Sequence, residues 1–139
     1  MNKGFTLIEI LIVIAIVAIL AAATTPFLSR FILVANFDST SDRFIGSIRK
    51  AQAHAMDGRN NETWGICKSG NAVRVYSGSC AGPTLSEDFS IPTTIAVSNF
   101  SDTTFNTRSE PSQPMSVVIS TSIESISIEV NAAGGIQIN

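Results

Sequence analysis

The chain has 139 residues and a formal net charge of -2 at pH 7, a length that suits one domain of ordinary size. The charge is unevenly divided: residues 30–59 carry five basic and three acidic side chains, whereas residues 60–139 carry three and seven. A nucleic-acid-binding domain usually has a basic stripe and net positive charge. The acidic C-terminal part argues against that class, and no nucleic-acid partner is expected.

The N-terminal segment is far more apolar than the rest. From Phe5 to Ala23 there are nineteen residues with one charged side chain, Glu9. As a helix this run would be about 28 Å long, close to the hydrocarbon thickness of a bilayer. Lys3, at its N-terminal side, favours a short cytoplasmic end and an exported C-terminal part. The run therefore predicts a transmembrane helix.

A cleaved secretory signal is the competing interpretation of this segment. Ala21-Ala22-Ala23 could serve as a small-residue cleavage site. However, the apolar run is too long for a typical signal, and its basic start is limited to Met1-Asn2-Lys3. A membrane anchor fits the segment better.

Glu9 is the anomaly of the run, because an ionisable side chain inside a membrane segment is costly and usually functional. The cation that could reach it is a new α-amino group on Phe5, formed if the chain were cut after Gly4, or the same amine of another copy. The simpler alternative is a carboxylate near a helix end that snorkels to the membrane surface.

The stretch Lys3-Gly4-Phe5-Thr6-Leu7-Ile8-Glu9, with the apolar run after it, resembles the class III signal of type IV pilins and type II secretion pseudopilins. The resemblance covers about residues 1–30. It implies cleavage after Gly4 by a prepilin peptidase, N-methylation of Phe5, and neutralisation of a neighbouring subunit's Phe5 amine by Glu9. Pro26 lies where the family commonly has a helix-bending proline. Ala18 departs from the glycine of many pilins, which puts the loosening of the helix in filaments in doubt.

Beyond Pro26 the helical pattern continues. Apolar residues recur on one helical face, namely Phe37, Phe44, Ile48, Ala51 and Ala55. Gly58 stands where a glycine would end the helix. One helix is therefore predicted from Phe5 to Met56, bent near Pro26, with its second half packed on a sheet. His54 is predicted to lie off the apolar face, at the surface, without a catalytic role.

The remainder is predicted to be β-rich, because short runs of β-branched residues alternate with polar residues and turn signals. The predicted strands are Thr63–Cys67, Ala72–Ser77, Ile91–Val97, Thr103–Thr107, Met115–Thr121, Ile126–Val130 and Ile136–Ile138. Residues 68–71 and 131–135 are predicted hairpin turns. Residues 109–114 are a predicted loop because they contain two prolines.

Cys67 and Cys80 are candidates for a disulfide, since a membrane-targeting N-terminus places them outside the cytoplasm, where disulfides persist. Simple hairpin geometry pairs Cys67 with a residue near Ala72, so a bridge to Cys80 requires the chain to fold back at Gly78-Ser79. Two separate buried thiols are the alternative. A metal site is not expected, because the one histidine, His54, is distant and no CxxC pattern occurs.

A long bent N-terminal helix packed on antiparallel β-sheets is an α+β architecture, and it is the pilin fold. The expected parts are a leader peptide at 1–4, a transmembrane and filament-core half-helix at 5–28, an amphipathic half-helix at 29–58 and a β-rich head at 59–139. The stretch from Ile48 to Tyr76 and the strands from Phe105 to Ile138 are also similar to minor pilins and pseudopilins of the GspH/FimT type, through element order and the Trp64-Gly65 junction.

The resemblance implies a structural subunit of a type IV pilus-like filament. The chain would be a single-pass inner-membrane protein before assembly and part of an extracellular or periplasmic filament afterwards. Its partners would be identical or related pilin subunits, the prepilin peptidase, an inner-membrane assembly platform and membrane lipid. A pseudopilin of a type II secretion or DNA-uptake system, and a tip-located minor pilin acting as a binding module, are the alternatives. The sequence contains no familiar catalytic motif, so neither enzyme activity nor a cofactor is expected.

Overall fold

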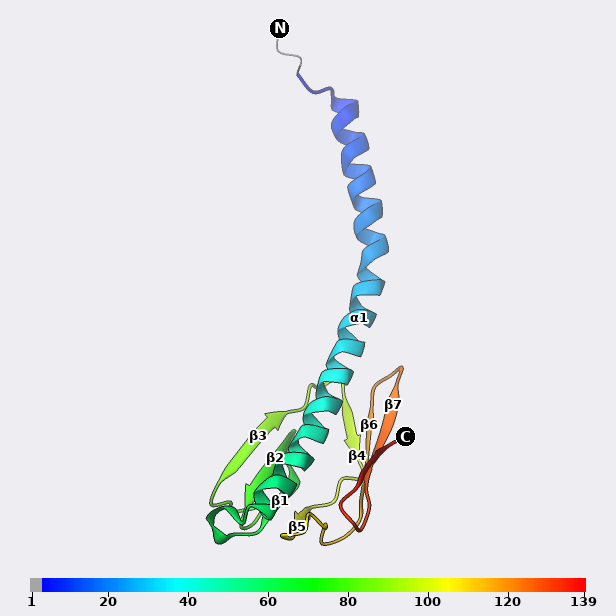
Figure 1. The fold of residues 1–139 in the computed structure, drawn as a ribbon. Helices are drawn as coiled ribbons and strands as arrows, with labels where there is room; N and C mark the ends of the chain where they lie inside the picture. Colours follow the sequence, from blue (N-terminus) through cyan, green and yellow to red (C-terminus); the bar gives the residue numbers. More distant parts are fainter. Residues whose placement is uncertain (1–3) are drawn as a thin grey trace. The chain divides into compact units, whose positions relative to one another are not determined.

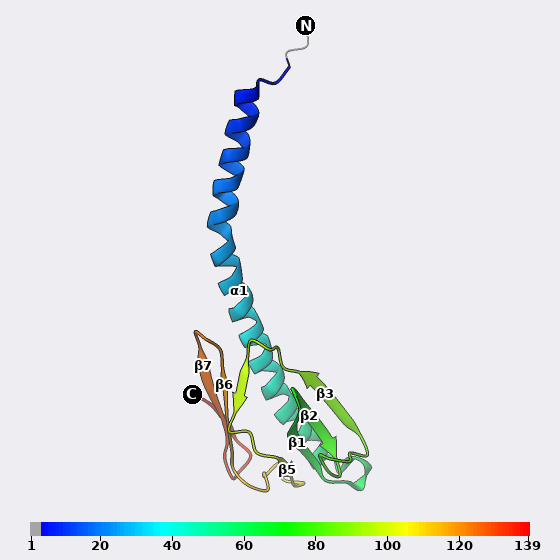
Figure 2. The ribbon, with the colours of Figure 1, turned by 180° about the vertical axis from the view of Figure 1, so that it is seen from behind.

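The computed structural model describes residues 4–139, apart from the side chains of residues 24–26. The chain divides into two compact units, Met1–Ala35 and Asn36–Asn139. One α-helix, α1, extends from Leu7 to Met56, and eight antiparallel strands follow it in the described residues (Figures 1 and 2). The predicted α+β pilin fold, a long N-terminal helix followed by antiparallel sheet, is confirmed.

Helix α1 begins two residues later than predicted and ends at the predicted Met56. Gly58 takes a left-handed φ of 58°, and its N–H donates to the Ala55 carbonyl at 3.2 Å. A glycine accepts this φ at little cost, so it ends the helix. A short 3₁₀ helix, η1 (Arg59–Asn61), follows. Pro26 lies within α1, and the bend predicted there stays a prediction.

The strands form two four-stranded sheets. In the first, the order is β3-β2-β1-β5, with β1 at Trp64–Ser69, β2 at Ala72–Ser77, β3 at Ser86–Ser90 and β5 at Thr103–Phe105. In the second, the order is β4-β6-β7-β8, with β4 at Ala96–Ser98, β6 at Met115–Ser120, β7 at Ser125–Val130 and β8 at Ile136–Ile138. Strands β2 and β8 have the predicted bounds.

The predicted strand Ile91–Val97 is wrong for most of its length. The chain turns there, and the Ile95 N–H donates to the Pro92 carbonyl at 3.0 Å. Proline has no N–H to give to a ladder, so pairing resumes only at β4. Strand β2 pairs with β1 on one side and with β3 on the other, and the polar sequence of β3 did not predict a strand there.

The second half of α1 packs on both sheets within the unit Asn36–Asn139 (Figure 2). The predicted apolar face of the helix is buried, each of its five residues being at most 5% exposed. These residues join the inner faces of the two sheets in one core, whose largest members include Phe44, Ile48, Ile66, Val73, Met115, Val117, Ile119 and Ile128. Helical periodicity in the sequence thus gave the buried face correctly.

Gly65 in β1 lies directly beneath the buried ring of Tyr76 in β2. A Cβ at position 65 would lie 2.7 Å from the Thr103 carbonyl oxygen and 2.8 Å from the Tyr76 ring. We expect Gly65→Ala to lower the free energy of unfolding by about 1–3 kcal/mol, because the sheet cannot yield without moving backbone. Denaturant titration of the detergent-solubilised full chain, followed by tryptophan fluorescence of Trp64, measures the change.

Gly46→Ala is the matched control. No atom outside its own helix turn lies within 4 Å of a Cβ built on Gly46, in the interior of α1. Alanine there should raise stability by about 0.5–1 kcal/mol through helix propensity. Unchanged stability of Gly65→Ala would contradict the close packing of Tyr76 on Gly65.

Candidate functional site

The residues before α1 are accessible. Gly4, Phe5 and Thr6 are exposed and have no regular secondary structure. Among residues 4–139, nothing lies within 4 Å of a Cβ built on Gly4, and its φ is not in the left-handed region. The described part of the fold therefore does not require glycine at position 4.

Thr6 is the N-cap of α1. Its Oγ1 accepts a hydrogen bond from the Glu9 N–H at 3.3 Å, and its carbonyl accepts from the N–H groups of Glu9 and Ile10 at 3.1 and 3.3 Å. A threonine followed three residues later by a glutamate is the capping-box pattern. Hydropathy does not reveal this cap, although the Thr6–Glu9 pattern is readable in the sequence. It explains why the helix begins at Leu7 and leaves Phe5 outside.

Glu9 lies in the first turn of α1, where free backbone N–H groups favour a negative charge. Its side chain is exposed, and Phe5, Ile10 and Val13 line a shallow hollow beside it. Neither of the ion pairs in the described residues involves Glu9, and its hydrogen bonds there are made by its backbone. Within residues 4–139 the carboxylate is therefore available to a group from another chain.

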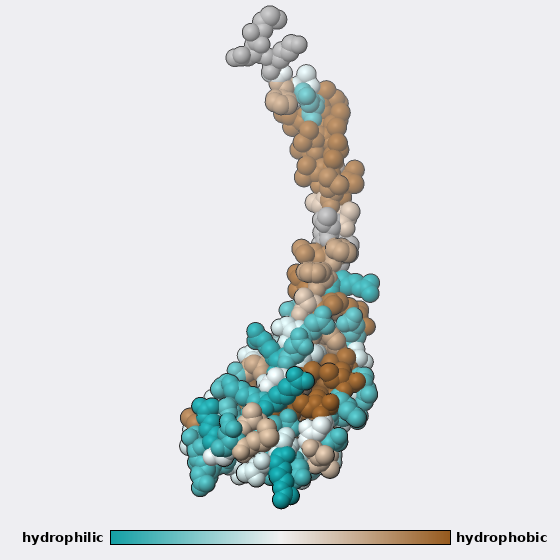
Figure 3. Space-filling model, viewed as in Figure 1, coloured by the Kyte–Doolittle hydropathy of each residue, from teal (hydrophilic) through white to brown (hydrophobic). Residues whose placement is uncertain are grey.

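The first unit presents an uncovered apolar surface. The large apolar side chains from Leu7 to Leu20 are 50–82% exposed, and Figure 3 shows them as a nearly unbroken hydrophobic surface. Phe27, Leu28, Phe31 and Ile32 continue it at 50–78% exposure. Helix α1 is long and apolar enough to cross a membrane. A surface of this extent needs lipid or other apolar helices around it.

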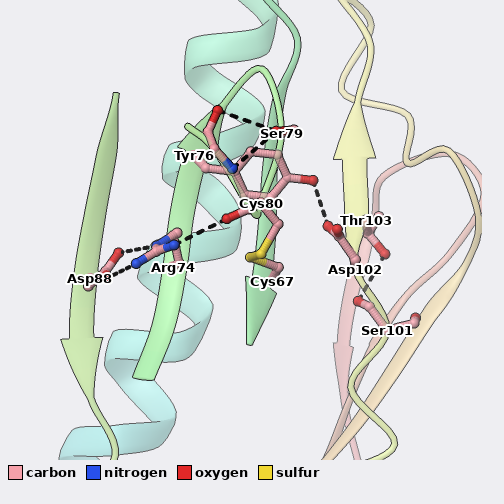
Figure 4. Close-up of a disulfide and its surroundings, with 10 residues drawn as sticks. Cys67, Arg74, Tyr76, Ser79, Cys80, Asp88, Ser101, Asp102 and Thr103 are labelled. Atoms are coloured by element: carbon pink, nitrogen blue, oxygen red, sulfur yellow. Dashed lines mark hydrogen bonds and ion pairs between the residues drawn. A yellow bond between two sulfur atoms is a disulfide. The ribbon is translucent and has the colours of Figure 1, made fainter. Parts of the chain in front are cut away.

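Cys67 and Cys80 form a disulfide in the second unit (Figure 4). In the β1–β2 ladder Cys67 is opposite Arg74, so the hairpin alone does not bring Cys80 near. The chain folds back after β2 at Gly78, which has a left-handed φ of 83°. This turn places the Cα atoms of the two cysteines 6.3 Å apart, within the range that a disulfide spans.

Arg74 fixes the loop that carries Cys80. Its guanidinium donates to both carboxylate oxygens of Asp88, at 2.8 and 2.7 Å, and to the Cys80 carbonyl at 3.1 Å (Figure 4). The hydrogen bond from Arg74 lowers the pKa of the Asp88 carboxyl below its usual value. The cluster therefore ties β2, β3 and the Cys80 loop together.

Tyr76 ties the same sheet to the segment before β5. Its hydroxyl donates to Asp102 Oδ1 at 2.5 Å (Figure 4). Burial of the phenol, followed by this hydrogen bond, raises the pKa of Tyr76 well above its usual range. The donor and acceptor satisfy each other, which indicates a structural role.

His54 lies off the apolar face of α1, and its ring packs on Trp64 with the ring centroids 4.5 Å apart. Partial burial, together with the nearby charges of Arg59 and Lys50, lowers the pKa of His54. In the part of the chain that the structure describes, no group of three or more His, Cys, Asp or Glu side chains could hold a metal ion.

Comparison with known proteins bears on the N-terminal segment. Residues 1–25 match the family model described as the prokaryotic N-terminal methylation motif. No match to this chain was found among curated proteins or among solved structures. The chain therefore carries a type IV pilin-like class III signal, which implies processing by a prepilin peptidase. The GspH/FimT-type head stays a prediction.

Proposed function

We propose that the chain is a structural subunit of a type IV pilus-like filament, assembled from the inner membrane by packing of N-terminal helices. The observation that carries this is the uncovered apolar surface of α1 directly behind a class III signal. The signal provides entry to the membrane and processing. The apolar surface provides the contact between subunits.

Processing would cut the chain after Gly4 and methylate the new N-terminus, Phe5. The exposure of both residues supports access by the peptidase and the methyltransferase. Because nothing in the described residues demands glycine at position 4, its small size is best explained by the peptidase site that must accept it.

In the assembled filament, Glu9 would pair with the Phe5 amine of a neighbouring subunit. A lone charged side chain deep in a membrane costs about 2.5–3.5 kcal/mol on insertion scales, and a cation beside it offsets that cost. Apolar helices gain little by leaving lipid for one another, since both surroundings are apolar. The carboxylate–amine pair therefore sets the register in which the helices pack, with the β-rich parts outward.

The subunit would reside in the inner membrane before assembly and in an extracellular or periplasmic filament afterwards. A pseudopilin of a type II secretion or DNA-uptake system has the same N-terminal requirements, so the same observations support it.

The test is to produce the chain in cells that contain the assembly machinery, shear the surface filaments and immunoblot them. We expect the chain in the sheared fraction, and immunogold label along the filament shaft. Label confined to the tip would indicate a binding subunit. Retention of the chain in the membrane pellet, while a known subunit is sheared off, would contradict a surface filament.

A further inference from the structure

The bond between Gly4 and Phe5 lies outside regular structure, two residues before α1 begins. Proteases cut exposed backbone that is free of secondary structure far more readily than backbone within a helix. The start of α1 thus decides whether this bond is presented in a cleavable form. Thr6 sets that start, because its Oγ1 and its carbonyl accept the first hydrogen bonds of the helix.

We propose that Thr6 is a positioning residue for cleavage after Gly4: as N-cap of α1 it keeps the Gly4–Phe5 bond out of the helix. This inference rests on the proposed function, since it concerns the processing of the same segment. It assigns Thr6 no contact with the reacting atoms.

A competing helix start is present in the sequence. Asn2 is also a residue type that caps helices well. A helix capped there would draw Gly4 and Phe5 into its first turn. Loss of the cap at Thr6 changes the equilibrium constant between a helix capped at Thr6 and one capped at Asn2 by about fivefold, in favour of Asn2.

The experiment uses the full-length precursor in membrane vesicles that contain a prepilin peptidase. We expect Thr6→Val, which keeps the shape but loses the oxygen acceptor, to raise KM by about two- to threefold with kcat unchanged, because the start at Leu7 predominates in the wild type. The apparent affinity of the peptidase for the precursor falls as fewer chains have the helix start at Leu7, which leaves the Gly4–Phe5 bond cleavable. Thr6→Asn and Thr6→Ser keep a capping oxygen and should not raise KM above the wild-type value. Thr24→Val, twenty residues beyond Gly4 in the chain, is the matched control.

Amide hydrogen exchange provides a readout of the helix start itself. In Thr6→Val the amides of residues 6–8 should gain protection, because an earlier start gives them carbonyl partners one turn back. In Thr6→Asn they should exchange as in the wild type.

Three results would overturn the role of Thr6. The first is wild-type KM and exchange in Thr6→Val. The second is equally slow cleavage of the Val and Asn variants, which would show that the peptidase requires the threonine side chain itself and not a capping oxygen. The third is a change in kcat alone. Failure of the wild-type precursor to be cut after Gly4 would instead refute the processing step of the proposed function, and the role of Thr6 with it.

Discussion

Glu9→Ala should insert into the membrane and be cut after Gly4, yet yield at least tenfold less filament than the wild type. Alanine is apolar and favours helix, so insertion is not impaired. What is lost is the partner of the neighbouring Phe5 amine, which then has to enter an apolar helix bundle without a compensating charge. Immunoblots of membrane and sheared fractions measure the two steps separately.

Two further substitutions test whether filament assembly requires the charge of Glu9 and not merely its contribution to the start of α1. Glu9→Gln keeps the capping-box pattern with Thr6 but loses the charge, so it should also fail to assemble. Glu124→Ala, which removes an exposed carboxylate from the second unit, should assemble normally. Normal incorporation of Glu9→Ala into filaments would sink the proposed pair.

Gly4→Val should leave the chain folded and inserted but reduce cleavage by at least about tenfold, the usual scale for one misfitting side chain in an enzyme pocket. The fold has open space at this position, so the loss would lie in recognition by the peptidase. Uncut chains have no Phe5 amine, so filament assembly should fail as well. Electrophoresis of the membrane fraction distinguishes the precursor from the shorter mature chain.

Gly46→Ala is the matched control for that variant, because it makes a similar change at another open glycine, far from the signal. It should be cut as fast as the wild type. Wild-type cleavage of Gly4→Val would mean that position 4 does not select the site.

Long regular patterns were predictable from the sequence. The buried face of α1 follows from helical periodicity, and β2 and β8 follow from alternation between polar and apolar residues. Strand β3 was not predictable in this way, because Ser86, Glu87 and Asp88 are polar. Its place depends on partners distant in the chain: Glu87 pairs with Lys50 on α1, and Asp88 pairs with Arg74.

The N-terminal signal could be predicted from the sequence, but hydropathy alone places the start of α1 two residues too early. Because Phe5 is the first residue of the apolar run, hydropathy alone predicts that the helix begins there. The hydroxyl of Thr6 competes for the first free N–H groups and moves the start to Leu7.

The disulfide between Cys67 and Cys80 could not be settled from the sequence, for a different reason. The β1–β2 register separates the two residues, and only the conformation at Gly78 brings them together. Sequence spacing does not contain that information, because it depends on how the loop packs back on the sheet.

Mass spectrometry of the N-terminal peptide, taken from chain recovered in sheared filaments, tests the central claim most directly. The proposed function predicts a peptide that begins at Phe5 and carries one added methyl group on its α-amine. A chain that still begins at Met1, or one cut near Ala23, would contradict it.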